Sequence, residues 1–342
     1  MRPTRYLLLF AALASGSASA PAFAQPVADF YRGKTVSVVV GFPPGGGYDA
    51  NSRVLARFMG KFIPGNPSVV ASNMPGAGSL VAANHMYNAA PKDGTAFVII
   101  ASSVAVEPFL NNDKARFDPL KFGWLGSMSQ EASYCGVWRR PGNATSWDEV
   151  MTKETVFGGG APSAITSQHP QILANVLGAK IKVINGYQGS RDINLAMQRG
   201  EVAGSCGMFS SSIKTSWIRE VTSGDLKLVM QVGPKKSQEY GDVPHVFDYA
   251  KTEEDRGVLD FHFGQLLLSR PYAAPPGIPE DRLKALRDAF VATLKDPEFL
   301  AEANRAGLDI DPVPADEIVA LLTKFSKFPR NILERSKSVI ER

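Results

Sequence analysis

The sequence predicts an α/β protein of two lobes, and three observations lead to this fold class. Strand-like segments alternate with helix-period segments along most of the 342 residues. Glycine-rich turns follow the strand-like segments and precede the helices. The pattern fills residues 35–110 and returns in residues 154–232, so each half can build its own sheet and core.

Residues 1–24 have the layout of a cleavable secretory signal peptide. Arg2 and Arg5 precede a short apolar run, and the small residues Ala22 and Ala24 place the cleavage before Gln25. A membrane anchor is the less favoured alternative, because the run is well short of the ~20 residues needed to span a bilayer. The mature protein is therefore expected to be periplasmic.

Three strand-turn-helix units are predicted to open the mature chain. Residues 35–40 form the first strand, "SVVASNM" (68–74) the second and "TAFVIIASS" (95–103) the third. Units of this length imply a parallel sheet with right-handed crossovers. The carboxyl ends of the three strands then share one edge, which is where open parallel sheets bind ligands.

Glycines gather at this edge, just ahead of the helices. Gly45, Gly46 and Gly47 follow the first strand, and Gly76 and Gly78 follow the second. Bare backbone N–H groups and the positive end of a helix dipole favour anions there, and glycine has no Cβ to hold a ligand away. A single such turn is most simply a turn, but several meeting at one edge favour an anion site. Asp49 is expected to cap a helix that begins near Ala50.

The middle of the chain repeats the arrangement, and the end is helical. Strands are predicted at 154–157, 180–186, 201–209 and 226–232, with helices over 165–177 and 193–199. The segment "SRPYAAPPGIP" (269–279) contains four prolines and predicts an extended connection in place of a helix or a central strand. We expect crossings near 121–131 and 231–238, so that residues 25–126 plus 236–342 form lobe 1 and residues 127–235 form lobe 2.

Charge and cysteine content narrow the function. The net charge of +4 falls to +2 when Arg2 and Arg5 leave with the signal peptide, and no Lys/Arg cluster indicates nucleic-acid binding. Cys135 and Cys206 could form a disulfide, which persists outside the cytoplasm, or remain two buried free thiols. A bridge of this span would add about 4 kcal/mol in the chain-entropy model.

Catalytic motifs are sparse. "ADFYRGKT" (28–35) has a loose phosphate-loop pattern but precedes a strand, so the helix start that such a loop needs is missing. The four histidines show no metal-ligand spacing. We therefore expect no catalytic residue, no metal and no cofactor. A secreted hydrolase is the alternative from another class, and it would require His169 to be hydrogen-bonded to a serine such as Ser163.

A series of motifs carries a family resemblance. "FPPGGGYDANSRVLARFM", "NMPGAGSLVAANHMYNAAPKDGTAFVI", "FDPLKFGWLGS", "NGYQGSRDINLAMQRGEV" and "APPGIPEDRLKALRDAF" occur in this order. Together they resemble the extracytoplasmic solute receptors of tripartite tricarboxylate transporters, the Bug family. The resemblance implies a type II periplasmic binding-protein fold, with two α/β lobes joined by a hinge and a ligand cleft between them. It implies a monomer that captures a di- or tricarboxylate or an aromatic acid and delivers it to membrane permease subunits. A sensor that presents the solute to a signalling receptor is the alternative.

The resemblance also implies ligand contacts from both lobes. Family members hold a carboxylate with backbone N–H groups and bridging waters from the first two glycine loops, and use a glycine/serine loop and a Tyr-x-Gly turn in the second lobe. The family's Pro-Tyr-Lys-Gly is Gly186-Tyr187-Gln188-Gly189 here, which removes a cation, and its Asp after Gly-x-Val is Ala203. The predicted ligand-binding residues are Phe42, Pro44, Gly45, Gly46, Gly47, Gly76, Ala77, Gly78, Ser102, Ser103, Gly160, Ser163, Tyr187, Gly189 and Ser205.

Overall fold

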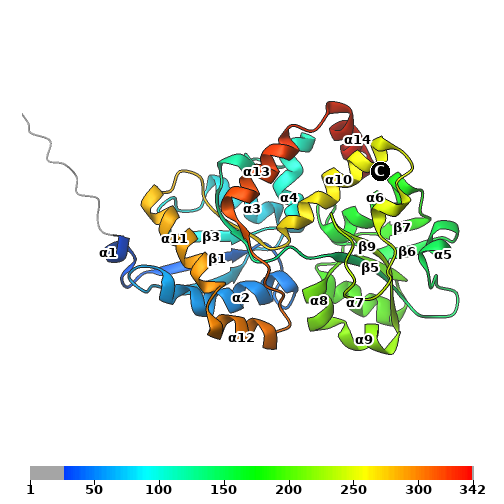
Figure 1. Ribbon diagram of the computed structural model, residues 1–342, viewed down its shortest axis with the longest axis horizontal. Helices are drawn as coiled ribbons and strands as arrows, with labels where there is room; N and C mark the ends of the chain where they lie inside the picture. The colour runs from blue at the N-terminus through cyan, green and yellow to red at the C-terminus, as the bar shows by residue number, and fades with distance from the viewer. Residues whose placement is uncertain (1–26, 341–342) are drawn as a thin grey trace, which may run out of the picture.

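The computed structural model describes residues 27–340, which form two lobes, each built on one sheet (Figure 1). The predicted signal peptide, residues 1–24, lies outside the described residues. In spatial order the first sheet contains β11 (Val313–Pro314), β4 (Gly123–Ser127), β10 (Pro271–Ala274), β3 (Ala96–Ile99), β1 (Thr35–Val40) and β2 (Ser68–Asn73). The second contains β7 (Ile181–Ile184), β6 (Thr155–Gly158), β8 (Gly204–Phe209), β5 (Ser133–Trp138) and β9 (Leu226–Val232). The predicted fold class of two α/β lobes is confirmed.

The parallel part of the first sheet brings three strand ends together. Strand β1 pairs in parallel with β2 and β3, and Val40 lies opposite both Asn73 and Ile99. The helices that follow these strands are α2 (Gly47–Met59), α3 (Leu80–Asn88) and α4 (Ser102–Val106). Their N-terminal ends therefore point to one edge of the sheet, as the alternation of strands and helices predicts.

The proline-rich segment "SRPYAAPPGIP" corrects one expectation. Strand β10 is central, antiparallel to β3 on one side and to β4 on the other. The expectation that four prolines exclude a central strand is wrong because of their positions. Pro271 is the first residue of the strand, where a missing N–H is tolerated, and the other three follow its end.

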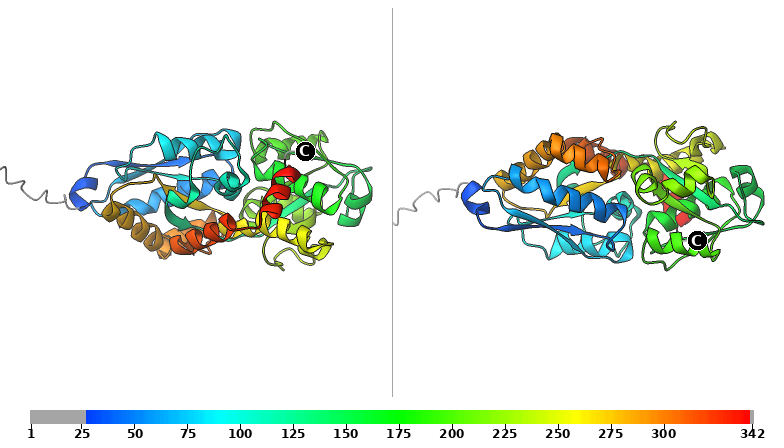
Figure 2. Two further views of the ribbon diagram at one scale, coloured as in Figure 1. Left: turned by 90° about the horizontal axis from the view of Figure 1, so that it is seen from above. Right: turned by 90° about the horizontal axis from the view of Figure 1, so that it is seen from below.

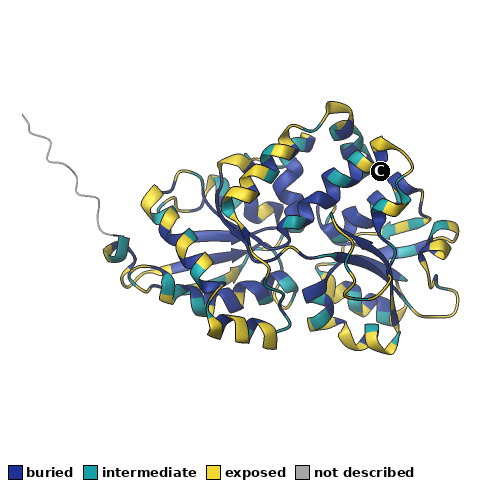
Figure 3. Cartoon of the chain, viewed as in Figure 1, coloured by how far each residue is buried: buried dark blue, intermediate teal, exposed yellow. Residues whose placement is uncertain are grey.

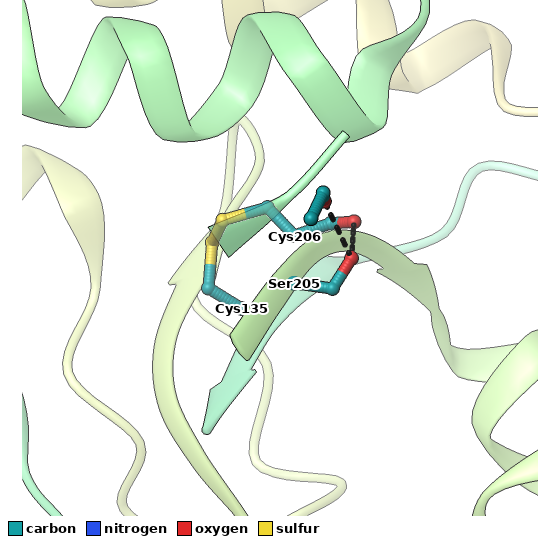
Figure 4. Close-up of a disulfide and its surroundings, with 4 residues drawn as sticks. Cys135, Ser205 and Cys206 are labelled. Atoms are coloured by element: carbon teal, nitrogen blue, oxygen red, sulfur yellow. Dashed lines mark hydrogen bonds between the residues drawn. A yellow bond between two sulfur atoms is a disulfide. The ribbon is translucent and has the colours of Figure 1, made fainter. Parts of the chain in front are cut away.

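In the second lobe, helices flank a mixed sheet. They are α5 (Trp147–Thr152), α6 (Ile165–Leu177), α7 (Ser190–Arg199), α8 (Ser210–Ser216) and α9 (Ile218–Ser223). Cys135 on β5 and Cys206 on the neighbouring antiparallel β8 form a disulfide, one of the two states that the sequence left open (Figure 4). Beside it, the Ser205 hydroxyl donates to the Cys206 carbonyl at 3.2 Å. The bond thus ties together two strands of one lobe.

The lobes lie side by side along the long axis of the molecule (Figure 2). The chain passes from the first sheet to the second between β4 and β5, and returns between β9 and β10. The inner strands are largely buried, the edge strands β2 and β7 are partly exposed, and the outer helix faces are exposed (Figure 3). The remaining helices are α1 (Val27–Tyr31), α10 (Glu253–Gly264), α11 (Glu280–Thr293), α12 (Pro297–Arg305), α13 (Ala315–Ser326) and α14 (Arg330–Ile340).

Helices α10 and α14 cover the junction between the lobes. Both come from the stretch assigned to lobe 1 by sequence, and both pack against α6 of the second lobe. Helix α14 also contacts residues Glu107–Leu110 of the first lobe. The residue limits given for the lobes stay a prediction. Within residues 27–340, no helix combines the length and the apolar character that crossing a membrane would require.

Two histidines are buried where α6 meets α10. His169 packs edge-on against Phe263 with ring centroids 5.1 Å apart, and neither of its ring nitrogens has a hydrogen-bond partner among the described residues. Burial lowers the pKa of His169 to about 3, and a charge on His262 would act in the same direction. Burial lowers the pKa of His262 to about 4, although its Nε2 lies 3.1 Å from the Ser336 carbonyl oxygen. Both imidazoles are neutral at pH 7.

These depressed pKa values predict a loss of stability in acid. In the unfolded chain histidine titrates near pH 6.5, so protonation favours unfolding as the pH falls below that value towards 4. The free energy of unfolding, measured in urea, should fall between pH 7 and pH 4 by up to about 1.4 kcal/mol per pH unit for each histidine. His169→Phe should reduce this slope, whereas His85→Gln, on α3, serves as the control. An unchanged slope in His169→Phe would contradict this explanation.

Candidate ligand-binding cleft

A cavity of about 620 Å³ lies between the lobes. Lobe 1 contributes the loop after β1, the start of α2 and the Pro75–Gly78 turn. Lobe 2 contributes the starts of α6 and α7 and the end of β8. The cavity therefore lies at the strand ends of both sheets, where a ligand was expected.

The start of α2 faces the cavity without a capping side chain. Gly46 is the N-cap, with extended backbone at φ −95° and ψ 174°, and no side chain among residues 27–340 caps the first N–H groups. Gly46 and Gly47 both line the cavity. The unused N–H groups of a 13-residue helix, with its dipole behind them, make this end a suitable position for a negative group.

Asp49 does not cap α2, which corrects a second expectation. The helix begins at Gly47, two residues before Asp49. The Asp49 carboxylate accepts the N–H of Gly45 at 2.9 Å and pairs with Arg53, also at 2.9 Å. The Gly45 N–H is therefore already hydrogen-bonded to Asp49, whereas the N–H groups of Gly46 and Gly47 remain available to a ligand.

The second glycine loop has left-handed backbone throughout. Values of φ are +149° at Gly76, +45° at Ala77, +63° at Gly78 and +83° at Ser79. Such values are unfavourable for alanine and serine and are found where a surrounding structure enforces them, often at binding sites. Here the Ser79 hydroxyl accepts the N–H of Ala101 at 2.9 Å and ties the loop to the turn between β3 and α4.

Two more uncapped helices begin on the opposite wall. Ala164 is the N-cap of α6 and Gly189 that of α7, and neither helix start has a side-chain cap. A Cβ at Gly46 would lie 3.8 Å from the Ser190 Oγ, so the starts of α2 and α7 face each other across the cleft. Beside them, Leu195, Met208 and Trp217 supply an apolar surface.

The lobes touch along one side of the cleft. The Ser163 hydroxyl donates to the Ala77 carbonyl, and the Ser103 hydroxyl donates to the Ser163 carbonyl at 3.1 Å. A Cβ at Gly78 would lie 2.7 Å from the backbone nitrogen of Ala164, nearer than real Cβ atoms approach. Backbone therefore meets backbone, and the structure is a closed form of the protein.

The cavity brings most of the predicted ligand-binding residues together. Those that line it are Phe42, Pro44, Gly46, Gly47, Gly76, Ala77, Gly78, Gly160, Tyr187, Gly189 and Ser205. Gly45, Ser102, Ser103 and Ser163 do not. Ser103 and Ser163 join the two lobes, and Ser102 is buried with a hydroxyl that has no hydrogen-bond partner within residues 27–340. Contact with a ligand stays a prediction for the whole set.

Two arginines and one tryptophan of the cavity were not predicted from the sequence. Arg270, Arg191 and Trp217 line it and were not among the predicted residues. Arg270 is fully buried. One signal was present in the sequence: Arg270 is the single charge within the run "GQLLLSRPYAAP", and a lone charge in an apolar run requires a buried partner or a functional role.

The pairing required by a hydrolase is not formed. Ser163 donates to Ala77, and the ring nitrogens of His169 have no partner in residues 27–340. In the same part of the chain, no group of three or more His, Cys, Asp or Glu side chains could hold a metal ion.

Two α/β lobes closed on a cavity lined by helix starts define the class of two-lobed solute-binding proteins. The model of the tripartite tricarboxylate transporter family receptor matches residues 52–342, and the chain belongs to this family of periplasmic solute-binding receptors. It is 26% identical to the UPF0065 protein in the gbd 5′ region of Cupriavidus necator, over 97% of this chain and 94% of that protein.

Solved structures have the same fold. The periplasmic binding protein BugD superposes with a TM-score of 0.66 at 19% identity, covering 90% of this chain and 98% of BugD. MatC from Rhodopseudomonas palustris, solved with malate, gives 0.64 at 18% identity and covers 90% and 99%. Another R. palustris protein, solved with adipate, gives 0.66 at 15% identity and covers 87% and 97%.

The contact at Gly78 predicts that a side chain there holds the cleft open. In Gly78→Ala the new methyl group would meet the Ser163–Ala164 backbone, so small-angle scattering should give a larger radius of gyration than for wild type. Gly33→Ala is the matched control, because Gly33 has a similar φ of +70° and open space around it. Identical scattering from Gly78→Ala and wild type would show that this contact does not limit closure.

Proposed function

We propose that the protein is a periplasmic receptor that captures a small carboxylated solute and delivers it to the permease subunits of a tripartite tricarboxylate transporter. The observation that carries this proposal is the start of α2. It presents uncapped N–H groups at Gly46 and Gly47 to a closed cavity between two lobes. A carboxylate supplies the acceptor oxygens and the negative charge that such a helix start lacks.

Closure makes these interactions stronger. When the lobes meet, water is excluded and the hydrogen bonds to a carboxylate act in a medium of lower dielectric constant. The same movement buries the solute between groups of both lobes, so that an occupied site adds to the stability of the closed form. A permease could distinguish loaded from empty receptor by this difference in shape.

The ligand class is a di- or tricarboxylate or an aromatic acid. A cavity of about 620 Å³ is of the size that holds small molecules. Malate and adipate, the ligands of two structural neighbours, are dicarboxylates. The aromatic and apolar residues Tyr187, Leu195 and Trp217 would also accommodate the body of an aromatic acid.

The proposal predicts that an acid stabilises the protein. Unliganded protein should gain thermal stability with at least one member of a panel of malate, adipate, citrate and phenylacetate. A ligand at 100 times its Kd adds about 2.7 kcal/mol through mass action. Differential scanning fluorimetry measures the shift in Tm, with the primary amides of the same acids as controls. No shift with any acid would contradict the proposed function.

Gly46 provides a test of the position of the site. Its backbone is extended, so any residue can adopt it, and an alanine Cβ would make an ordinary 3.8 Å contact with Ser190. The larger side chain in Gly46→Val would cover the N–H groups of α2. We expect Gly46→Val to weaken acid binding by calorimetry at least about tenfold, and Gly46→Ala to weaken it less, with little change in the Tm of either unliganded variant. Undiminished affinity in Gly46→Val would place the site elsewhere.

A further inference from the structure

Arg270 is a fully buried cation beside the cavity. Its side chain has no exposed surface, and it lines the cavity close to the start of α2. Nη1 donates to the Ser269 carbonyl at 3.1 Å and Nη2 to the Ser211 hydroxyl at 3.0 Å. Nε has no hydrogen-bond partner among residues 27–340. Nε–H is therefore a donor that no acceptor within residues 27–340 uses.

Aromatic rings hold the guanidinium in place. Phe42 stacks on Tyr48 with centroids 4.1 Å apart and ring planes within 13°. The Arg270 Cζ lies 4.7 Å from the Tyr48 ring centre and 4.2 Å from that of Phe209. Phe42 and Tyr48 belong to the first lobe and Phe209 to the second, and all four residues line the cavity. Rings in these positions orient a guanidinium and attract its charge without neutralising it.

Among residues 27–340, one carboxylate pairs with this cation, at a long distance. The Glu131 carboxylate lies 3.6 Å from the Arg270 Nη2, and its oxygens already accept from the Ser129 hydroxyl at 2.7 Å and the Ser211 N–H at 2.8 Å. A Cβ at Gly47 would lie 3.1 Å from the same Nη2, so the guanidinium adjoins the start of α2. Two positive features, a cation and a helix N-terminus, thus lie together, and an anion between them stabilises both.

We propose that Arg270 is a ligand-contacting residue that selects for an anion: its guanidinium and the first N–H groups of α2 hold one carboxylate of the solute together. This inference rests on the proposed function, and it names Arg270 as the group that makes ligand binding depend on the charge of the ligand. It adds a formal cation to the backbone donors and bridging waters that the family resemblance implies. A neutral analogue of the same shape would leave the guanidinium without this partner, so it should bind much more weakly.

The test compares an acid with its own primary amide. Calorimetry gives both affinities for wild type, with the acid of the panel above that binds most tightly. In Arg270→Gln the preference for acid over amide should fall about 10- to 150-fold, the range for a hydrogen bond to a charged group. Arg270→Lys should retain part of the preference for acid over amide. Arg199→Gln is the matched control, because Arg199 is an exposed arginine in the last turn of α7 that does not line the cavity, and the preference of this variant should change less than about threefold.

Removing Arg270 also leaves Glu131 buried without its cation, so the double variant Arg270→Gln/Glu131→Gln is measured alongside. A folded variant of either kind that keeps the wild-type preference would overturn the inference and leave the proposed function intact. Failure of wild type to bind any acid would refute both this inference and the proposed function.

A measurement on wild-type protein tests the inference even if the variants do not fold. With 15N-labelled arginine, the slowly exchanging Nε–H signal of the buried guanidinium should shift on adding acid and not on adding amide, and an unmoved signal would overturn the inference.

Discussion

Burying the guanidinium of Arg270 where the two lobes meet constrains much of the molecule. Its partners come from both crossings of the chain, Glu131 in the first and Ser269 in the second, and from Ser211 at the start of α8. A buried cation cannot lose these partners without a large cost. The crossings, the start of α2 and the end of β8 are therefore held around one charge.

The rest of the cleft follows from helix starts and close backbone contact. Helices α2, α6 and α7 all begin at the cavity without a side-chain cap, so their N–H groups and dipoles act on the same small volume. Gly78 lets the two lobes approach until backbone touches backbone. Both features concern backbone atoms, which explains why a site for an anion can form here with few charged side chains.

Periodicity predicted the parts of the fold that depend on local sequence. The strands predicted at 35–40 and 68–74 and the helix predicted at 165–177 are present, the second strand one residue shorter, because their apolar spacing is regular. Strand β10 was not, since only the positions of the prolines relative to the strand ends make it acceptable. Gly46, Gly47, Gly76 and Gly78, which line the cavity, could be singled out because glycine before a helix is a local signal. Arg270 was not found, because its role depends on rings and a carboxylate distant in sequence.

The most direct test of a carboxylate site between Arg270 and the start of α2 is a crystal structure of wild-type protein purified natively, which retains any solute that the protein has captured. We expect this structure to show closed lobes and a carboxylate within hydrogen-bond distance of the Gly46 or Gly47 N–H and of the Arg270 guanidinium. A solute that presents a neutral group to Arg270 would contradict this site, as would a solute whose acid group lies only against the second lobe.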